Sequence, residues 1–161
     1  MTVAYRIGLL LILALALSLS LGCSKKSSGA DPLAGEEGWS PEMQAAAQQI
    51  RSGTIYFDFD KYDIRPEYRE TLRNKAELMK RFSQIRVRIE GHCDERGTQE
   101  YNLALGERRA RAAYDYMIML GVSGGQMEVL SFGKERPAVM GSGENNWGKN
   151  RRDEFNVISG R

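Results

Sequence analysis

The chain has 161 residues and a formal net charge of +2, from 23 Lys and Arg against 21 Asp and Glu. This length accommodates one compact domain and some unstructured sequence rather than two domains. Because acidic and basic residues are interspersed, the sequence has no basic region of the kind that binds nucleic acid. One His and two Cys are too few for a structural zinc site of the zinc-finger type, so we expect no metal and no cofactor.

Residues 1–22 have the pattern of a secretory signal peptide. Arg6 is followed by an apolar run at 7–21, and no Asp or Glu occurs before Asp31. A cationic start, a short apolar core and then small residues are typical of such a leader. The alternative is a transmembrane helix, which needs about 20 apolar residues, whereas this run has 15. The sequence therefore predicts a signal peptide.

The leader ends in Leu-Ser-Leu-Gly-Cys at residues 19–23. This segment resembles the lipobox of bacterial lipoproteins, in which the Cys becomes the lipidated N-terminus. It departs from that pattern at Ser20, where such proteins usually carry Leu. The resemblance implies lipidation of Cys23 by several acyl chains, which together hold a protein stably at a membrane because each buried CH₂ contributes about 0.8 kcal/mol. Ser24 after the Cys, rather than Asp, implies sorting to the outer membrane.

Residues 23–41 are rich in Ser, Gly, Lys, Glu and Asp. Such a composition cannot bury enough apolar surface to order itself, so we expect a lipidated N-terminus followed by a flexible linker. A short helix is predicted for residues 41–50, with Ser40 as its N-cap and Pro41 in its first turn. The folded domain is then expected to span residues 42–161.

Hydrophobic periodicity within the domain predicts four strands and two further helices. The strands are expected at residues 54–59, 85–91, 127–132 and 154–158, and the helices at residues 66–82 and 101–120. The stretch 133–148 contains Gly and Pro, and we expect it to be a loop. This order predicts an α+β fold, a two-layer α/β sandwich with two main helices packed on one face of a small mixed β-sheet.

Three clusters of polar and aromatic residues fall at strand ends or in loops, where binding sites commonly lie on a rigid scaffold. They occupy residues 57–64, 91–110 and 150–152. Along the chain the motifs read Phe-Asp-Phe-Asp-Lys-Tyr, Glu-Gly-His-x-Asp-Glu-Arg-Gly-Thr, Tyr-Asn-x-x-Leu-Gly-Glu-Arg-Arg-Ala, Phe-Gly-Lys-Glu-x-Pro and Asn-Arg-Arg. Together they resemble the OmpA-like peptidoglycan-binding domain, and within that group the lipoproteins of the Tol–Pal system. The resemblance covers about residues 54–158.

The resemblance implies a ligand, the diaminopimelate of an uncrosslinked peptide of the cell wall, whose far end carries one ammonium and one carboxylate. It also implies that Asp94 binds the ammonium and Arg109 the carboxylate, since the guanidinium fork matches a carboxylate bidentately. We expect both side chains at the rim of the domain. The other residues expected at the pocket are Asp58 and the backbone around Phe57, together with Asn102, Leu105 and Arg151.

Some roles stay open from the residues alone. Asp94 and Arg109 could instead form a structural ion pair on a loop. Asp60 and Asp63 fit turn formation better than ligand contact, because Asp readily accepts hydrogen bonds from nearby backbone. The sequence does not decide which member of the cluster 150–152 faces the pocket.

The family resemblance further implies the cellular role. It describes a lipoprotein of the outer membrane whose domain faces the periplasm, binds peptidoglycan without a covalent bond and contributes to envelope integrity and cell division. TolB and other Tol proteins are the protein partners that it implies. The alternative is a protein-interaction module for which TolB is the main partner.

A catalytic interpretation of the second cluster is disfavoured by strand geometry. His92 and Cys93 are adjacent at a strand end, so their side chains leave on opposite faces and cannot form a dyad. Asp94 and Glu95 are also neighbours, unlike the two carboxylates that flank a glycosidic bond. We therefore expect a protein that is not an enzyme. Cys93 stands where the family usually has Ala or Thr, and either a small buried residue or a reactive thiol fits that position.

Overall fold

The computed structural model describes residues 38–158, so the predicted signal peptide, the lipidation of Cys23 and most of the linker lie outside the described residues. The described helices are α2 (Pro41–Arg51), α3 (Arg69–Arg81), α4 (Gln99–Met119) and α5 (Glu144–Asn150). The strands are β1 (Ile55–Tyr56), β2 (Arg86–His92), β3 (Met127–Gly133) and β4 (Arg152–Ile158). Within this described range, no helix has both the length and the hydropathy of a membrane span.

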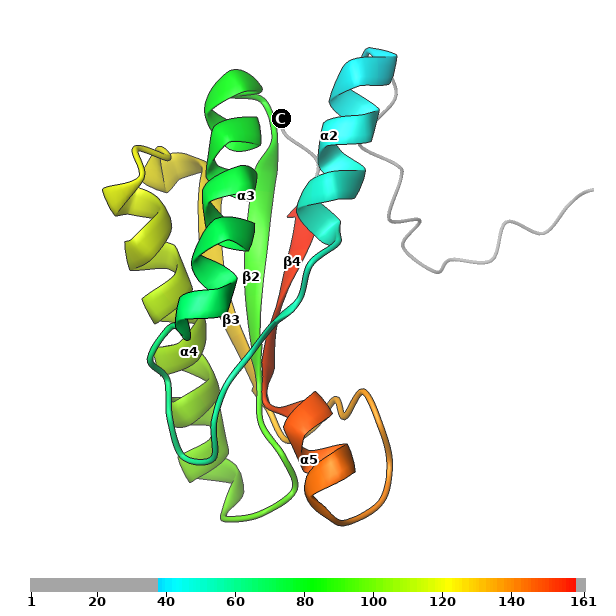
Figure 1. Ribbon diagram of the computed structural model, residues 1–161, viewed down its shortest axis with the longest axis vertical. Helices are drawn as coiled ribbons and strands as arrows, with labels where there is room; N and C mark the ends of the chain where they lie inside the picture. The colour runs from blue at the N-terminus through cyan, green and yellow to red at the C-terminus, as the bar shows by residue number, and fades with distance from the viewer. Residues whose placement is uncertain (1–37, 159–161) are drawn as a thin grey trace, which may run out of the picture. The chain divides into compact units, whose positions relative to one another are not determined.

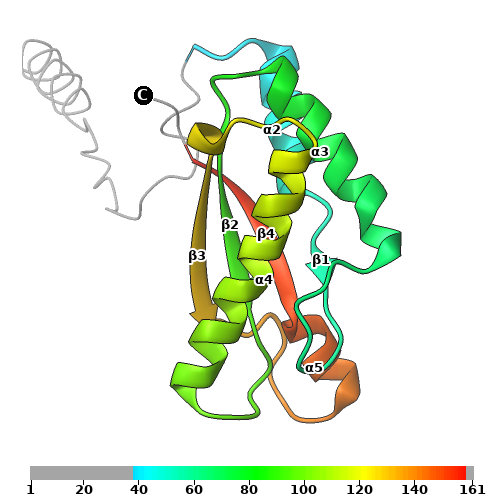
Figure 2. The same ribbon diagram turned by 90° about the vertical axis from the view of Figure 1, so that its left-hand side faces the viewer.

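The four strands form one mixed sheet in the order β1-β4-β2-β3. Strand β2 is parallel to β3 and antiparallel to β4, and β1 is antiparallel to β4. Helices α2, α3 and α4 lie on one face of this sheet (Figures 1 and 2). The predicted two-layer α+β architecture is therefore confirmed, and α2 adds a third helix beside the two main ones.

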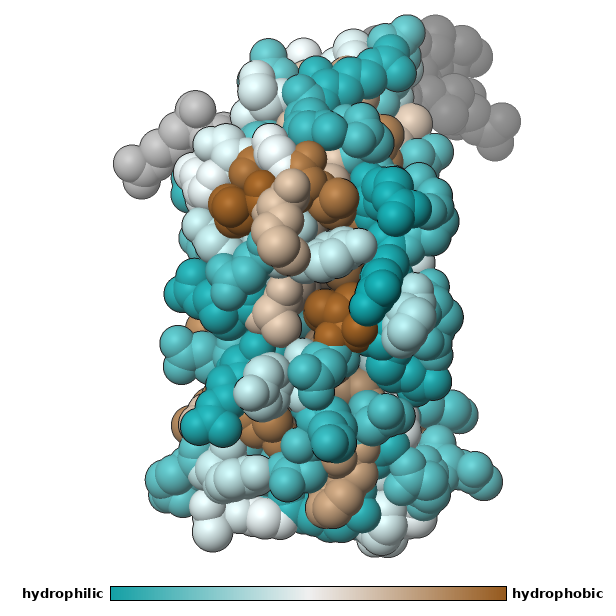
Figure 3. Space-filling model, turned by 60° about the vertical axis from the view of Figure 1, so that its left-hand side comes forward, coloured by the Kyte–Doolittle hydropathy of each residue, from teal (hydrophilic) through white to brown (hydrophobic). Residues whose placement is uncertain are grey.

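The hydrophobic core fills the space between the sheet and these helices. Its fully buried members include Ile50, Phe57, Leu72, Met79, Ile89, Met117 and Phe155. The surface is different in character. The side of the molecule turned toward the viewer in Figure 3 is mainly hydrophilic, with apolar side chains gathered in small patches between polar ones.

Helix α2 forms as its sequence predicts. The hydroxyl of Ser40 accepts a hydrogen bond from the backbone N of Met43 at 3.2 Å, and Pro41 occupies the first turn. A Ser N-cap satisfies one of the free N–H groups at a helix start, and Pro in the first turn has no N–H to satisfy. The helix buries Ala46, Ala47 and Ile50.

The first predicted strand, residues 54–59, is too long. Strand β1 contains only Ile55 and Tyr56. The backbone N of Phe57 still donates to the carbonyl of Arg151 at 2.9 Å, but the chain then turns, and Asp60 adopts a φ of +58°. Asp tolerates this left-handed conformation better than most residues. The segment after β1 is therefore a loop, as its turn-forming Asp60 indicates.

Helix α4 begins two residues earlier than predicted, because Thr98 acts as an N-cap and accepts from the backbone N of Tyr101 at 3.2 Å. Its backbone packs directly on β2. A Cβ added at Gly91 would lie 1.9 Å from the carbonyl oxygen of Gly106. Two glycines thus let helix and strand approach closely, and this contact sets the start of α4 beside the end of β2.

Helix α5 is absent from the predicted elements, because most of it falls in the stretch 133–148, which is expected to be a loop. Its sequence, Glu-Asn-Asn-Trp-Gly-Lys-Asn, has low helix propensity, and it has no side-chain N-cap. A tertiary contact holds it instead: the indole Nε1 of Trp147 donates to the carboxylate of Glu95 at 2.9 Å. This contact joins segments 52 residues apart, so local sequence could not show it.

Candidate functional site

A pocket of about 190 Å³ opens among the loop after β1, the end of β2, the start of α4 and the residue after α5. Of the residues predicted for the site, it is lined by Asp94, Asn102, Leu105, Arg109 and Arg151. The pocket also contains residues that the sequence reasoning did not assign to it, namely Phe59, Asp60, Cys93, Arg96, Gly97 and Tyr101.

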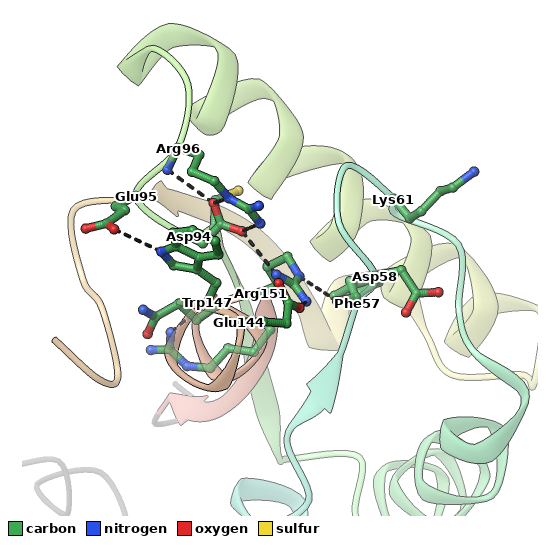
Figure 4. A network of polar contacts seen from close by, with 12 residues as sticks. Phe57, Asp58, Lys61, Asp94, Glu95, Arg96, Glu144, Trp147 and Arg151 are labelled. Atoms are coloured by element: carbon green, nitrogen blue, oxygen red, sulfur yellow. Dashed lines mark hydrogen bonds and ion pairs between the residues drawn. The ribbon is translucent and has the colours of Figure 1, made fainter. Parts of the chain in front are cut away.

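The carboxylate of Asp94 is the centre of the polar network in Figure 4. Its Oδ1 accepts from the backbone N and from Nε of Arg96, both at 3.1 Å. Its Oδ2 accepts from Nη2 of Arg96 at 2.6 Å and from Nη1 of Arg151 at 3.2 Å. Burial raises the pKa of Asp94, but the hydrogen bonds from the two arginines outweigh it and leave the pKa below its ordinary value. Asp94 is therefore an anion at neutral pH.

Arg109 is fully buried, with an exposed fraction of 0%, and Asp94 is only 4% exposed, so the expectation that both side chains lie at the rim is wrong. Its guanidinium donates to the backbone oxygens of Lys61 at 2.8 Å, His92 at 2.8 Å and Asp58 at 3.3 Å, and to Sγ of Cys93 at 3.4 Å. Burial lowers its pKa. Arg109 thus joins the loop after β1 to the end of β2 while it also lines the pocket.

Arg151 is the member of the cluster 150–152 that faces the pocket. Its Nε donates to the carbonyl of Phe57 at 3.0 Å, and its other nitrogens contact Asp94 and Glu144. Its neighbours point elsewhere. Arg152 pairs with Glu154 at 2.6 Å, and Asn150 exchanges hydrogen bonds with the backbone of Val139, donating at 2.8 Å and accepting at 3.0 Å.

Phe57 and Asp58 do not line the pocket with their side chains. The ring of Phe57 is part of the core, with 1% exposure. The carboxylate of Asp58 lies 3.5 Å from Arg65 and is turned away from Asp94 in Figure 4. Both residues contribute instead through their backbone oxygens, which accept from Arg151 and Arg109. The physical reason is that β1 ends at Tyr56 and the chain turns before the side chain of Asp58 can point inward.

Arg96 and Asp60 were not assigned to the site. Arg96 stacks between the rings of Phe59 and Trp147, with its guanidinium carbon 4.0 Å and 4.1 Å from their centroids. Asp60 accepts a hydrogen bond from the hydroxyl of Tyr101. The signal that could have identified Arg96 is its place in the loop motif, two residues after Asp94, since an Asp side chain commonly bonds to the residue two positions on.

Cys93 is a buried thiol, with 3% exposure. Its Sγ donates to the carbonyl of Asn102 at 3.3 Å, and burial raises its pKa to about 11. The thiolate is the nucleophilic form, so Cys93 is poorly suited to covalent chemistry at neutral pH. Its neighbour His92 stacks on Phe132, with the ring centroids 5.5 Å apart. Of the two possibilities for Cys93, the structure favours a small buried residue.

Among residues 38–158, the side chains of Glu90, His92 and Glu154 place potential metal-ligand atoms within 4.8 Å of one another. These residues lie on β2 and β4, where Glu90 pairs in register with Glu154. The carboxylate of Glu154, however, is already bound by the guanidinium of Arg152. The guanidinium of Arg152 thus already provides the positive charge that a metal ion would bring, and we do not assign a metal to this cluster.

Comparison with known proteins identifies relatives over most of the domain. The model of the OmpA family matches residues 56–151. A peptidoglycan-associated lipoprotein of Pseudomonas aeruginosa is 43% identical over 150 residues, covering 84% of this chain and 88% of the relative. A protein of the same name from Pasteurella multocida is 44% identical over 131 residues, covering 81% of this chain and 83% of that protein.

A solved structure agrees with these sequence relatives. The crystal structure of the peptidoglycan-associated lipoprotein from Burkholderia pseudomallei superposes with a TM-score of 0.67 at 38% sequence identity. The alignment covers 80% of this chain and 100% of the crystallised chain. Sequence and fold therefore lead to the same group of proteins.

Proposed function

This chain belongs to the OmpA family, within the group of peptidoglycan-associated lipoproteins, and we propose that it binds peptidoglycan non-covalently in the pocket around Asp94, without catalysis. One observation supports this proposal above all: the buried anion Asp94 and the buried cations Arg109 and Arg151 line a single small pocket. Buried charges are costly unless they are paired or bind a charged partner. Opposite charges close together suit a ligand that itself carries both signs.

The ligand that fits this arrangement is the free end of diaminopimelate in an uncrosslinked wall peptide. Its ammonium would bind Asp94, and its carboxylate would bind Arg109 and Arg151. Four of the five N–H groups of Arg109 are engaged by the protein, so Arg109 has one donor left for a ligand. We therefore propose that Arg151 shares the carboxylate with Arg109. Asn102 and Leu105 would shape the wall of the pocket from α4.

The experiment that tests this function is co-sedimentation of the chain from Ser24 onward with purified cell-wall sacculi. Asp94→Asn should remove most of the binding, because the isosteric amide leaves the ligand ammonium without an anion. Asp115→Asn changes an exposed carboxylate on α4 outside this pocket and should bind like the wild type. Wild-type binding by Asp94→Asn would exclude this pocket as the wall site. Release of soluble wall fragments during incubation would contradict the absence of catalysis.

The leader and the family support a proposal for the cellular setting. We propose that Cys23 is lipidated, that the lipids lie in the outer membrane, and that the domain faces the periplasm at the end of the linker. The chain would then connect the outer membrane to the cell wall in a Tol–Pal type system that supports envelope integrity and cell division.

A second function, binding of TolB and other Tol proteins, is supported by the exposed aromatic rim of the pocket. Phe59 is 58% exposed and Tyr101 49% exposed, and both line the pocket. Aromatic side chains are enriched at the centres of protein interfaces. If TolB covers this rim, sacculi should compete with TolB for the domain, and Phe59→Ala should weaken TolB binding more than sacculus binding. Simultaneous binding of both partners would place TolB elsewhere.

A further inference from the structure

The carboxylate of Asp94 has no acceptor position left for a ligand. Each oxygen accepts two hydrogen bonds, and three of the four donors belong to Arg96 while one belongs to Arg151. A carboxylate offers about four acceptor positions in total. An incoming ammonium can therefore bind Asp94 only if one of these donors leaves.

The side chain of Arg96 is the donor that can leave. Its own backbone is held in place, because Nδ2 of Asn102 donates to the carbonyl of Arg96 at 2.7 Å and Nζ of Lys134 donates to the carbonyl of Gly97 at 2.7 Å. The side chain of Arg151 is only 7% exposed, whereas that of Arg96 is 31% exposed. Rotation about its own side-chain bonds would carry the Arg96 guanidinium into water while the loop stays fixed.

Arg96 occupies its position as a bound cation would. Its guanidinium forms a two-point contact with Asp94 and stacks between the rings of Phe59 and Trp147. An anion combined with aromatic faces is a common way to bind a cationic ligand group. The chain thus fills the ammonium position with one of its own residues.

The charges that line the pocket lead to the same conclusion. With Arg96 in place, three guanidinium groups face two carboxylates, an excess of one positive charge. Without it, two groups of each sign remain, which matches a zwitterionic ligand with no net charge. The residues concerned are Asp60, Asp94, Arg96, Arg109 and Arg151.

We propose that Arg96 is an internal competitor that occupies the ammonium position beside Asp94 and that the ligand must displace. This inference rests on the proposed binding of a diaminopimelate end group in this pocket. An ammonium replaces the contacts that Asp94 loses, but an anion without an ammonium does not, so it binds with Arg96 still in place. Arg96 therefore lowers the affinity for the wall peptide and keeps the attachment reversible.

Isothermal titration calorimetry with two small ligands tests this competition. The protein is the chain as it is purified from cells, kept in solution with a mild detergent. Meso-diaminopimelate carries ammonium and carboxylate groups, whereas pimelate has the same carbon chain with carboxylates only. Arg96→Gln should bind diaminopimelate at least about threefold more tightly, because the fraction of molecules with a free Asp94 rises. The same variant should bind pimelate no better than the wild type. The control is Arg108→Gln. It removes an exposed charge on α4 beside the buried Arg109, and it should change neither affinity.

A second readout follows the displacement itself in a protein with native Arg96. In Trp39→Phe, Trp147 is the remaining tryptophan, and it loses its stacked guanidinium when Arg96 leaves. Its fluorescence should change on titration with diaminopimelate and stay constant with pimelate. Weaker diaminopimelate binding by Arg96→Gln, or a constant Trp147 signal while the ligand binds, would overturn the role of Arg96 but not the proposed function. Failure of the wild type to bind diaminopimelate would overturn both.

Discussion

Arg109 combines a role in the pocket with a role in the interior of the domain. Removal of its side chain would take a hydrogen-bond donor from the backbone oxygens of Lys61 and His92, whereas that of Asp58 would keep its bond from the backbone N of Lys61 at 3.2 Å. Buried acceptors that lose their partner cost about 1–3 kcal/mol each. At this residue, a loss of binding alone cannot separate ligand contact from folding.

We therefore predict that Arg109→Ala lowers the free energy of unfolding by about 3–5 kcal/mol, as expected when a buried charged group is removed from its partners. Asp94→Asn should lose binding with a smaller change in stability, because the amide keeps the shape and part of the hydrogen bonding. Urea denaturation followed by circular dichroism measures both values. Equal stability of Arg109→Ala and wild type would mean that water replaces the guanidinium at the three carbonyl groups.

The lowered pKa of His92 leads us to predict that the free energy of unfolding depends on pH. Burial lowers its pKa to about 4, helped by the positive charge of Arg152, from an ordinary value of about 6.5. As the pH falls through 6.5, the unfolded chain binds a proton at this residue that the folded chain does not. Stability is therefore lost between pH 6.5 and 4, at about 1.36 kcal/mol per pH unit, and is unaffected above that window.

The matched measurement compares wild type with His92→Gln by urea denaturation at several pH values. The difference in free energy of unfolding between the two proteins should change by roughly 3 kcal/mol across the window. Above pH 7 the difference should be constant. A parallel pH dependence in both proteins would show that other groups, and not His92, cause the loss in acid.

At the scale of the elements, the contact between β2 and α4 fixes the geometry of the pocket. Asp94 follows β2, whereas Asn102, Leu105 and Arg109 lie on α4. The close approach of Gly91 and Gly106 sets the distance between these two groups of residues. A substitution there would act on binding without any contact to the ligand.

Gly91→Ala should therefore destabilise the domain by about 1–3 kcal/mol, the usual cost of overpacking, and should also weaken sacculus binding, because the added Cβ would force α4 away from β2. Gly125→Ala is the control, since a Cβ there meets no atom closer than 3.8 Å. Thermal melts and co-sedimentation measure the two effects. Loss of stability with unchanged binding would show that the pocket tolerates a shift of α4.

At the scale of the whole molecule, we expect the predicted lipid anchor at Cys23 and the described domain to have separate tasks. The domain would bind the wall, and Cys23 would hold the chain at the membrane through its acyl groups. Cys23→Ser should therefore leave the protein unlipidated and releasable from membranes by mild salt. Sacculus binding of the released protein should equal that of the wild type. Fractionation of cell envelopes measures the release, and full retention of the variant in membranes would mean that residues 1–22 remain as a transmembrane helix.

The sequence by itself determined the family, the α+β architecture and five of the residues that line the pocket. It could do so because these features are local. Helix and strand periods extend over neighbouring residues, and the motifs around Asp94 and Arg109 are continuous stretches of chain. For the same reason the N-cap at Ser40 could be predicted from two adjacent residues.

Only the tertiary structure decided which side chains face the pocket and which groups already bind one another. The burial of Arg109 depends on backbone oxygens up to 51 residues away, and the helix α5 depends on Glu95, 52 residues from Trp147. Such contacts exist only after the sheet has assembled, so no local pattern encodes them. The contact of Arg96 with Asp94 likewise depends on the rings of Phe59 and Trp147. These two residues come from distant segments and lie on either side of the Arg96 guanidinium.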